Sequence, residues 1–203
     1  KVNYAFEGSI FIAGAAVQWL RDGLKLVKNA SETEGMANEV KDSHDVFVVP
    51  AFAGLGAPYW DMYARGAIFG LTRDTDDRHM AKATLDSLAY QTKDILEAMQ
   101  KDSGAELKSL KVDGGAVANN YLMQFQADIL GVPVLRPEVI ESTAQGAAYL
   151  AGIGADIWKL EDLQKVQAID KTFSPEMDDD LRTDLYGTWN KAVKRTMNWL
   201  EED

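Results

Sequence analysis

The chain has 203 residues, no cysteine, and a formal net charge of −11, with 21 Lys and Arg against 32 Asp and Glu. Such acidity argues against a protein that binds nucleic acid, because that affinity comes mainly from Lys and Arg side chains that neutralise phosphates. The lack of cysteine excludes disulfides, thiolate nucleophiles and zinc held by cysteine. The longest apolar stretches, such as residues 10–17, are far shorter than the roughly 20 residues of a membrane-spanning helix, so we expect no membrane span.

The first residues have the pattern of a strand. Val2, Tyr4 and Phe6 occupy every second position within residues 1–7, and this period-2 alternation predicts a half-buried strand. Because the strand would begin at the first residue, we expect the chain to be part of a longer protein.

Helix-like and strand-like patterns then alternate along the chain. Helices are predicted from a cap at Ser9 to about residue 26, within 29–45, from a cap at Asp76 or Asp77 to about residue 101, and over 119–130, 142–151 and 178–200. Strands are predicted over 46–49 and 66–71, which pair naturally, and over 107–112 and 132–135. This order, without repeats or a linker, predicts one α/β domain over residues 1–203, with a sheet covered by helices.

The strongest sign of function is a glycine turn between a predicted strand and a predicted helix, at Asp113-Gly-Gly115. Such a turn directs backbone N–H groups from the positive end of a helix, which suits a phosphate or a nucleotide. The spacing matches neither Gly-x-Gly-x-x-Gly nor the lysine-bearing phosphate loop, so a dehydrogenase fingerprint and a P-loop are rejected. A plain strand-to-helix turn with Asn119 as the N-cap is an equally good interpretation.

A second candidate lies in the first predicted helix. Gly14 would cost roughly 1 kcal/mol there relative to alanine, and Gln18 lies four residues later on the same face. That face could admit a flat ligand beside the Gln18 amide. Spacing alone favours the alternative, in which Gly14 allows close helix packing and Gln18 is exposed.

The remaining segments give weaker signals. The loop 53–61 is either functional or an Ω-loop packed by Tyr59 and Trp60. The small residues of 142–148 indicate close packing against a neighbour. His44 and His79 have no metal or catalytic-triad pattern and are predicted at the surface. Nothing forms a complete catalytic set.

Several long stretches resemble the glycerol kinases of the carbohydrate kinase family, and the resemblance runs from Val2 to residues 191–195. The stretches are Val112-Asp-Gly-Gly-Ala-Val-Ala-Asn-Asn120, residues 122–130, Arg136-Pro-Glu138, Val48-Val-Pro-Ala-Phe-Ala-Gly-Leu-Gly-Ala-Pro-Tyr-Trp-Asp61, Ala64-Arg-Gly-Ala-Ile-Phe-Gly-Leu-Thr-Arg73 and Tyr90-Gln-Thr-Lys-Asp94. Two departures are Asp74, where the family commonly has Gly, and Gln145, where it usually has Leu.

The resemblance implies a ribonuclease-H-like, actin-like ATPase domain, an α/β fold with a mixed sheet flanked by helices. It implies that this chain is the C-terminal half of a two-domain kinase and supplies the adenosine side of the ATP site. On that basis Gly14, Gln18, Gly115 and Asn119 are expected to contact the nucleotide, with Gly114 as a supporting turn residue. The catalytic Asp, the glycerol-binding residues and most phosphate contacts would lie in the N-terminal domain. We therefore expect no catalytic residue and no identifiable Mg ligand here, and an inactive isolated chain.

The resemblance also implies partners and a location. The complete enzyme would use ATP with Mg, phosphorylate glycerol to sn-glycerol 3-phosphate in the cytoplasm, and form a homo-oligomer, either a dimer or a tetramer. Two alternatives remain open at this point. The chain could be a non-catalytic module for oligomerisation or for a regulatory protein, which would bind near Ser174–Arg182, or it could belong to another sugar kinase of the same family.

Overall fold

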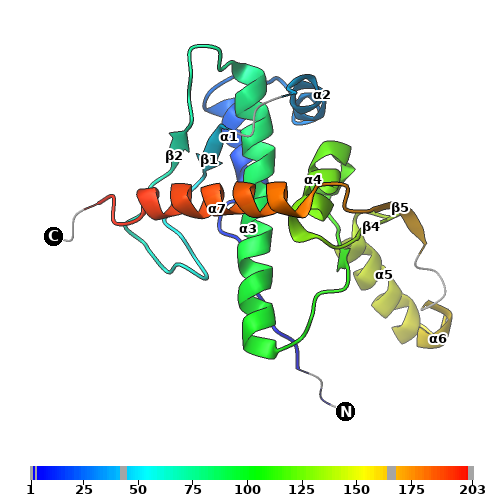
Figure 1. Cartoon of the computed structure of the whole chain (residues 1–203). Coiled ribbons are helices and arrows are strands. Elements are labelled where there is room, and N and C mark those ends of the chain that lie inside the picture. The colour runs from blue at the N-terminus through cyan, green and yellow to red at the C-terminus, as the bar shows by residue number, and fades with distance from the viewer. Residues whose placement is uncertain (1, 3, 42–44, 164–167, 201–203) are drawn as a thin grey trace.

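The structure, a computed structural model, describes residues 2, 4–41, 45–163 and 168–200 (Figure 1). Its helices are α1 (Gly14–Asp22), α2 (Glu32–Glu39), α3 (Asp77–Ser103), α4 (Asn120–Leu130), α5 (Ser142–Gly154), α6 (Leu160–Leu163) and α7 (Asp179–Thr196), with a 3-10 helix η1 (Gly115–Ala118). Its strands are β1 (Phe47–Val49), β2 (Ala67–Phe69), β3 (Leu110–Lys111), β4 (Val134–Pro137) and β5 (Ile169–Phe173).

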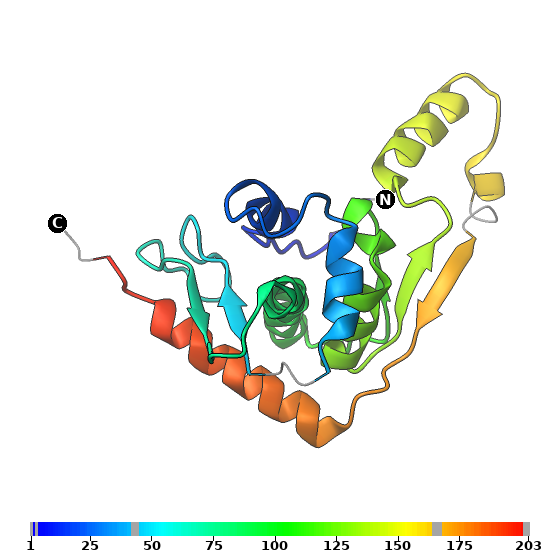
Figure 2. The same cartoon turned by 90° about the horizontal axis from the view of Figure 1, so that it is seen from above.

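The strands form two small sheets with helices around them. Strands β1 and β2 pair with each other, as predicted, and run antiparallel. In the other sheet, β4 pairs parallel with β3 and antiparallel with β5. Figure 2 shows α3 end-on between the two sheets, with α4 between α3 and the three-stranded sheet. The predicted α/β architecture is confirmed, including a mixed sheet.

Helix α3 is the central element, and its sequence explains both of its ends. The Asp76 side chain accepts hydrogen bonds from the backbone N–H groups of Arg78 and His79, at 3.1 and 3.3 Å, so Asp76 is the N-cap. Gly104 ends the helix with a φ of 68°, a conformation that favours glycine. His79 lies partly exposed at the surface, as predicted, and its ring contacts Asp76 in this cap. His44 lies outside the described residues.

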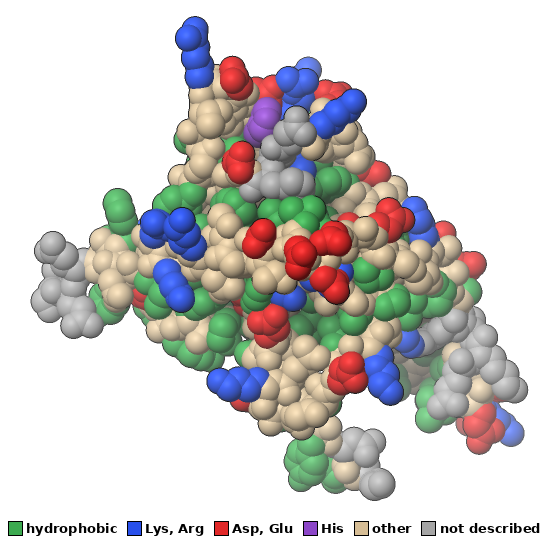
Figure 3. Space-filling view, in the orientation of Figure 1, with side chains coloured by type: hydrophobic (Ala, Val, Ile, Leu, Met, Phe, Trp, Pro, Cys, Tyr) green, Lys and Arg blue, Asp and Glu red, His purple; other side chains and the backbone are tan. Residues whose placement is uncertain are grey.

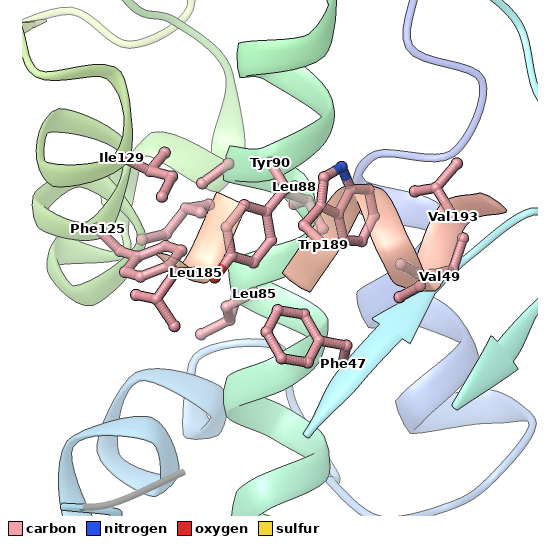
Figure 4. Close-up of a cluster of buried hydrophobic side chains, with 14 of the residues drawn as sticks. Phe47, Val49, Leu85, Leu88, Tyr90, Phe125, Ile129, Leu185, Trp189 and Val193 are labelled. Carbon is pink, nitrogen blue, oxygen red and sulfur yellow. The ribbon is translucent and has the colours of Figure 1, made fainter. Parts of the chain in front are cut away.

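The core joins α3 to α4, β1 and α7 through aromatic side chains. The ring of Tyr90 on α3 stacks on Trp189 of α7 at 5.1 Å between centroids and meets the edge of Phe125 of α4 at 5.4 Å (Figure 4). Phe47 of β1 lies 5.8 Å from Tyr90 on another side. Buried aromatic pairs of this kind contribute packing energy beyond the area that they bury. Elements from both halves of the chain therefore share one core.

Charges on α7 follow the helix dipole. Asp179 and Asp180 lie in its first turn, Lys194 and Arg195 in its last. Figure 3 shows this face, with acidic side chains over one half of α7 and basic side chains over the other. The Asp178 side chain caps the helix by accepting a hydrogen bond from the backbone N–H of Asp180 at 2.9 Å. The acidic run therefore lies at the N-terminus of the helix that was predicted over 178–200.

The structure differs from the expectations near the N-terminus. Residues 2 and 4–10 contain no strand, and Tyr4 is 95% exposed. The alternation is present, but a strand also needs a partner for its backbone groups, and no strand pairs with these residues in the described part of the chain. Helix α1 begins at Gly14 rather than at Ser9, with Ala13 at its N-cap position and no side-chain cap.

Helix α5 is a second difference. It projects from the body of the protein in Figure 2, and of its residues only Gly152 is buried. The small residues of 142–148 therefore do not pack closely on another described element, contrary to the prediction. None of the described helices is long and apolar enough to cross a lipid bilayer.

Candidate functional site

The four residues expected to contact a ligand, Gly14, Gln18, Gly115 and Asn119, all line one pocket of about 330 Å³. Helices α1, α2 and α3 and the segment from η1 to α4 form its walls. The other lining residues are Val17, Arg21, Ala30, Ser31, Thr33, Glu34, Leu85, Leu88, Ala116, Ala118 and Leu122. The fold therefore brings together two segments that are about a hundred residues apart in sequence.

Both glycines of this set open onto free space. A Cβ atom built on Gly14 or on Gly115 would meet no heavy atom within 4 Å. Close helix packing therefore does not explain Gly14, although Gln18 is exposed, as that alternative expected. Gly114, just before η1, has φ 85° and ψ 170°, a conformation that residues with a side chain rarely adopt. The glycine turn is thus needed for the backbone path at Gly114 and leaves space beside Gly115.

Protein groups already occupy the N-terminus of α4. The side-chain oxygen of Asn119 accepts a hydrogen bond from the backbone N–H of Leu122 at 2.9 Å, so Asn119 is the N-cap. Its amide nitrogen donates to the hydroxyl of Thr33 at 3.3 Å. The carboxylate of Glu34 accepts the backbone N–H of Asn120 at 3.1 Å. A phosphate at this helix end would meet a carboxylate and backbone groups that are already bonded, so this end does not suit a phosphate.

The side chains that line the pocket suit a flat, mostly uncharged group. Its walls include the apolar side chains of Val17, Leu85, Leu88 and Leu122, and the amide of Gln18 supplies hydrogen-bonding groups. The amide of Asn119 keeps one N–H and one acceptor lone pair beyond the bonds described above. Apolar walls with a few polar groups are typical of small-molecule sites.

The two charged residues of the lining are Arg21 and Glu34. Arg21 makes two hydrogen bonds of 2.7 Å with Asp22, its neighbour in sequence. The Arg21 guanidinium holds the pKa of Asp22 below its usual value, mainly through a hydrogen bond. The cation of the pocket is thereby partly neutralised, which again favours an uncharged group.

A match to a known protein family covers most of the chain and identifies the family to which the chain belongs. Residues 1–155 match the family model described as the C-terminal domain of the FGGY family of carbohydrate kinases. The chain belongs to this family. It is 62% identical over 203 residues to a glycerol kinase of Caldanaerobacter subterraneus subsp. tengcongensis, a match that covers 100% of this chain and 41% of that relative. The chain therefore spans well under half the length of the relative that it matches.

Solved structures of the FGGY family share the fold. The crystal structure of Plasmodium falciparum glycerol kinase with ADP aligns with a TM-score of 0.81 and 36% identity, over 90% of this chain and 37% of that one. A xylulose kinase from Lactobacillus acidophilus aligns with a TM-score of 0.73 and 21% identity, over 90% and 38%. The second likeness shows the fold alone. The expected ribonuclease-H-like, actin-like ATPase fold is confirmed.

Two pocket residues of this FGGY domain were missed by sequence reasoning. Thr33 and Glu34 lie on the short helix α2, in a polar segment without a motif. Their role depends on Asn119 and Asn120, 86 residues further along the chain, so no local pattern could have revealed it.

The loop before β2 is a structural feature of the domain. The carboxylate of Asp61 accepts the backbone N–H groups of Tyr63 at 2.8 Å and of Asn198 at 2.7 Å, which ties the loop to the segment after α7. Tyr59 is half-buried and donates to the side chain of Asn190 at 3.3 Å, whereas Trp60 is 73% exposed. Of these two aromatic residues, Tyr59 packs the loop in the way that an Ω-loop requires and Trp60 does not.

Proposed function

We propose that residues 1–203 form one domain, the C-terminal nucleotide-binding domain of a glycerol kinase, and that its pocket holds the adenosine part of ATP. The observation that carries this proposal is the convergence of Gly14, Gln18, Gly115 and Asn119 on one pocket. The two glycines open onto free space there, as close approach of a ligand to the backbone requires. The single-domain assignment is supported by a core that contains residues from Ala16 to Val193.

The electrostatics of the pocket favour the adenosine rather than the phosphates. Glu34 lies at the positive end of α4, where a phosphate would otherwise be stabilised. Adenine is flat and uncharged, and its edge offers both donors and acceptors. The amides of Gln18 and Asn119 offer both as well, and the apolar walls can contact its faces. The phosphates would then leave the pocket toward groups outside this chain.

The reaction itself would depend on a second domain. Phosphoryl transfer is catalysed by positioning and by stabilising charge around an in-line geometry, which needs both substrates and Mg in one closed site. The relatives named above are glycerol kinases, and this chain covers 41% of the one from Caldanaerobacter. We assign the catalytic base, the glycerol contacts and the Mg ligands to the part of the kinase that this chain does not contain.

A coupled assay of ADP release tests this division. The complete protein should release ADP from MgATP in a glycerol-dependent manner, and residues 1–203 alone should release none. Turnover by the isolated chain close to that of the complete protein would contradict the proposal. So would a complete protein that phosphorylates xylulose or gluconate in preference to glycerol.

A further inference from the structure

Asn120, the first residue of α4, is held by charged side chains from two other elements. Glu34 of α2 accepts the backbone N–H of Asn120 at 3.1 Å and its side-chain amide at 2.9 Å. On the other side, Arg136 of β4 donates to the side-chain oxygen of Asn120 at 3.1 Å. The backbone N–H of Asn120 is one of the helix-terminal groups that no helical carbonyl can satisfy, and a carboxylate is a favourable acceptor there.

Arg136 is itself fixed on several sides. The same Nη1 atom that contacts Asn120 also donates to the backbone carbonyl of Val117 in η1 at 3.1 Å. The other guanidinium nitrogens bind the carboxylate of Asp170 on β5, at 2.8 Å from Nε and 2.7 Å from Nη2. The guanidinium lies 5.3 Å from the ring centre of Phe173, and the Arg136 side chain is only 13% exposed. A planar cation held in this way is a rigid support.

Val117 and Asn120, which are held by the side chains of Arg136 and Glu34, lie in and directly beside one wall of the pocket. Asn119 lies between Val117 and Asn120, and Gly115 and Ala116 lie directly before Val117. Most of this wall consists of glycine and alanine, which have little side chain with which to pack. Val117 anchors the wall in the core, and hydrogen bonds to neighbouring elements help to fix the rest of it.

We propose that Glu34 and Arg136 are positioning residues, which fix the wall from Gly115 to Asn119 at the separation from α1 that the adenosine needs. Neither residue has to touch the nucleotide for this role. The inference rests on the proposed function, because it concerns the same pocket. It predicts that nucleotide affinity depends on the hydrogen-bond pattern around Asn120 and not on the charge of Glu34 as such.

The geometry allows a test in which the hydrogen bonds are broken and then restored. In Glu34→Gln, the new NH₂ group faces the NH₂ group of Asn120, and one hydrogen bond is lost. Asn120 cannot turn its amide around, because its NH₂ group would then face the guanidinium of Arg136. In Asn120→Asp, two carboxylates face each other. In the double variant, the glutamine introduced at position 34 accepts the backbone N–H of position 120 and donates to the new aspartate there, while Arg136 donates to the other oxygen of that aspartate.

The measurement is a titration of each variant of the 203-residue chain with ADP, followed through the backbone amide resonances of Gly14 and Gly115. Each single variant should bind ADP about tenfold more weakly, the loss expected when a hydrogen bond to a charged group is removed. The double variant should return to within about twofold of the unmodified chain. Hydrogen exchange at the backbone amide of position 120 should accelerate in Asn120→Asp, where repulsion between the two carboxylates moves Glu34 away from that N–H, and return to its original rate in the double variant.

The control is Glu39→Gln, which makes the same charge change on the same helix. Glu39 is 64% exposed and contacts only Arg78, at 3.5 Å, among the ion pairs found in the described residues. Its variant should bind ADP as the unmodified chain does. Equal ADP affinity in the unmodified chain, Glu34→Gln and Asn120→Asp would overturn the positioning role. A double variant that stays as weak as the singles would overturn it too. If ADP shifts no pocket resonance of the unmodified chain, the proposed function fails first, and the positioning role falls with it.

Discussion

The carboxyl group of Asp94 gives a prediction about stability that can be worked out from its surroundings. Asp94 lies on α3 and is 4% exposed. It accepts hydrogen bonds from the hydroxyl of Tyr186 at 2.7 Å and from the indole N–H of Trp189 at 2.9 Å. Burial raises the pKa of Asp94 from 3.8 to about 6, although both hydrogen bonds act in the opposite direction.

The sign of the effect follows from proton binding in the two states. Between pH 3.8 and about 6, Asp94 is mostly protonated in the folded chain and mostly ionised in the unfolded chain. The free energy of unfolding therefore falls as the pH rises through this window, by up to about 3 kcal/mol from this one group. About 1.4 kcal/mol of the change should appear between pH 5 and 7.5, above the isoelectric point near 4.7.

Asp94→Asn should remove this dependence. An asparagine is neutral at every pH, and its oxygen can still accept the indole N–H of Trp189. Its NH₂ group can donate to Tyr186, whose hydroxyl already lies 3.1 Å from the carboxylate of Glu97 and can donate there. We expect Asp94→Asn to be at least as stable as the unmodified chain at pH 7.5 and to lose that advantage toward pH 5.

Urea unfolding at pH 5, 6, 7 and 7.5 measures the effect. The difference in unfolding free energy between the two chains should change by about 1.4 kcal/mol over this range. Asp102→Asn is the matched control, since it removes a carboxylate from an exposed position of the same helix and should leave the pH profile unchanged. Parallel profiles for Asp94→Asn and the unmodified chain would show that Asp94 does not have a raised pKa in the folded chain.

Three further substitutions test the pocket, the cap and the core. Gly14→Ala should weaken ADP binding in an amide-shift titration without lowering stability, because the new Cβ enters the free space of the pocket. Gly187→Ala is the control, since Gly187 is also a helical glycine beside free space and its variant should bind ADP normally. Equal ADP affinities in the two variants would refute this prediction. Asp76→Ala should lower the urea-unfolding free energy by about 1 kcal/mol, whereas a cost as large from Asp77→Ala would show that the cap is misassigned. Trp189→Ala should cost about 3–5 kcal/mol in the same assay, and a cost below about 1 kcal/mol would contradict its place in the core.

Local patterns predicted the elements whose determinants lie close together in sequence. The N-cap of α3 at Asp76, one of two candidates, depends on residues within one turn of the helix start, and the helix ends at Ser103, close to the predicted end near residue 101. Strands β1 and β2 were recognisable because both are short apolar runs that flank a single loop. The cap of α4 at Asn119 was likewise one of the two interpretations that the glycine turn allowed.

Features that depend on distant parts of the chain were missed or wrong. Strand β5 pairs with β4 across more than thirty intervening residues, and four of its five residues are exposed, so it lacks an alternating pattern. The N-terminal segment has that alternation, but no strand pairs with its described residues. The pocket itself joins α1 to η1. Only the family resemblance connected Gly14 with Gly115, because periodicity says nothing about which helix faces which turn.

The most direct test of the proposed function is a comparison of three ligands on the 203-residue chain. Adenosine, ADP and inorganic pyrophosphate are each titrated while the backbone amide resonances are followed. If the pocket holds adenosine, both adenosine and ADP should shift the amides of Gly14, Gln18, Gly115 and Asn119, and pyrophosphate should not. Shifts of these amides by pyrophosphate with no response to adenosine would show that the pocket binds phosphate groups and not adenosine.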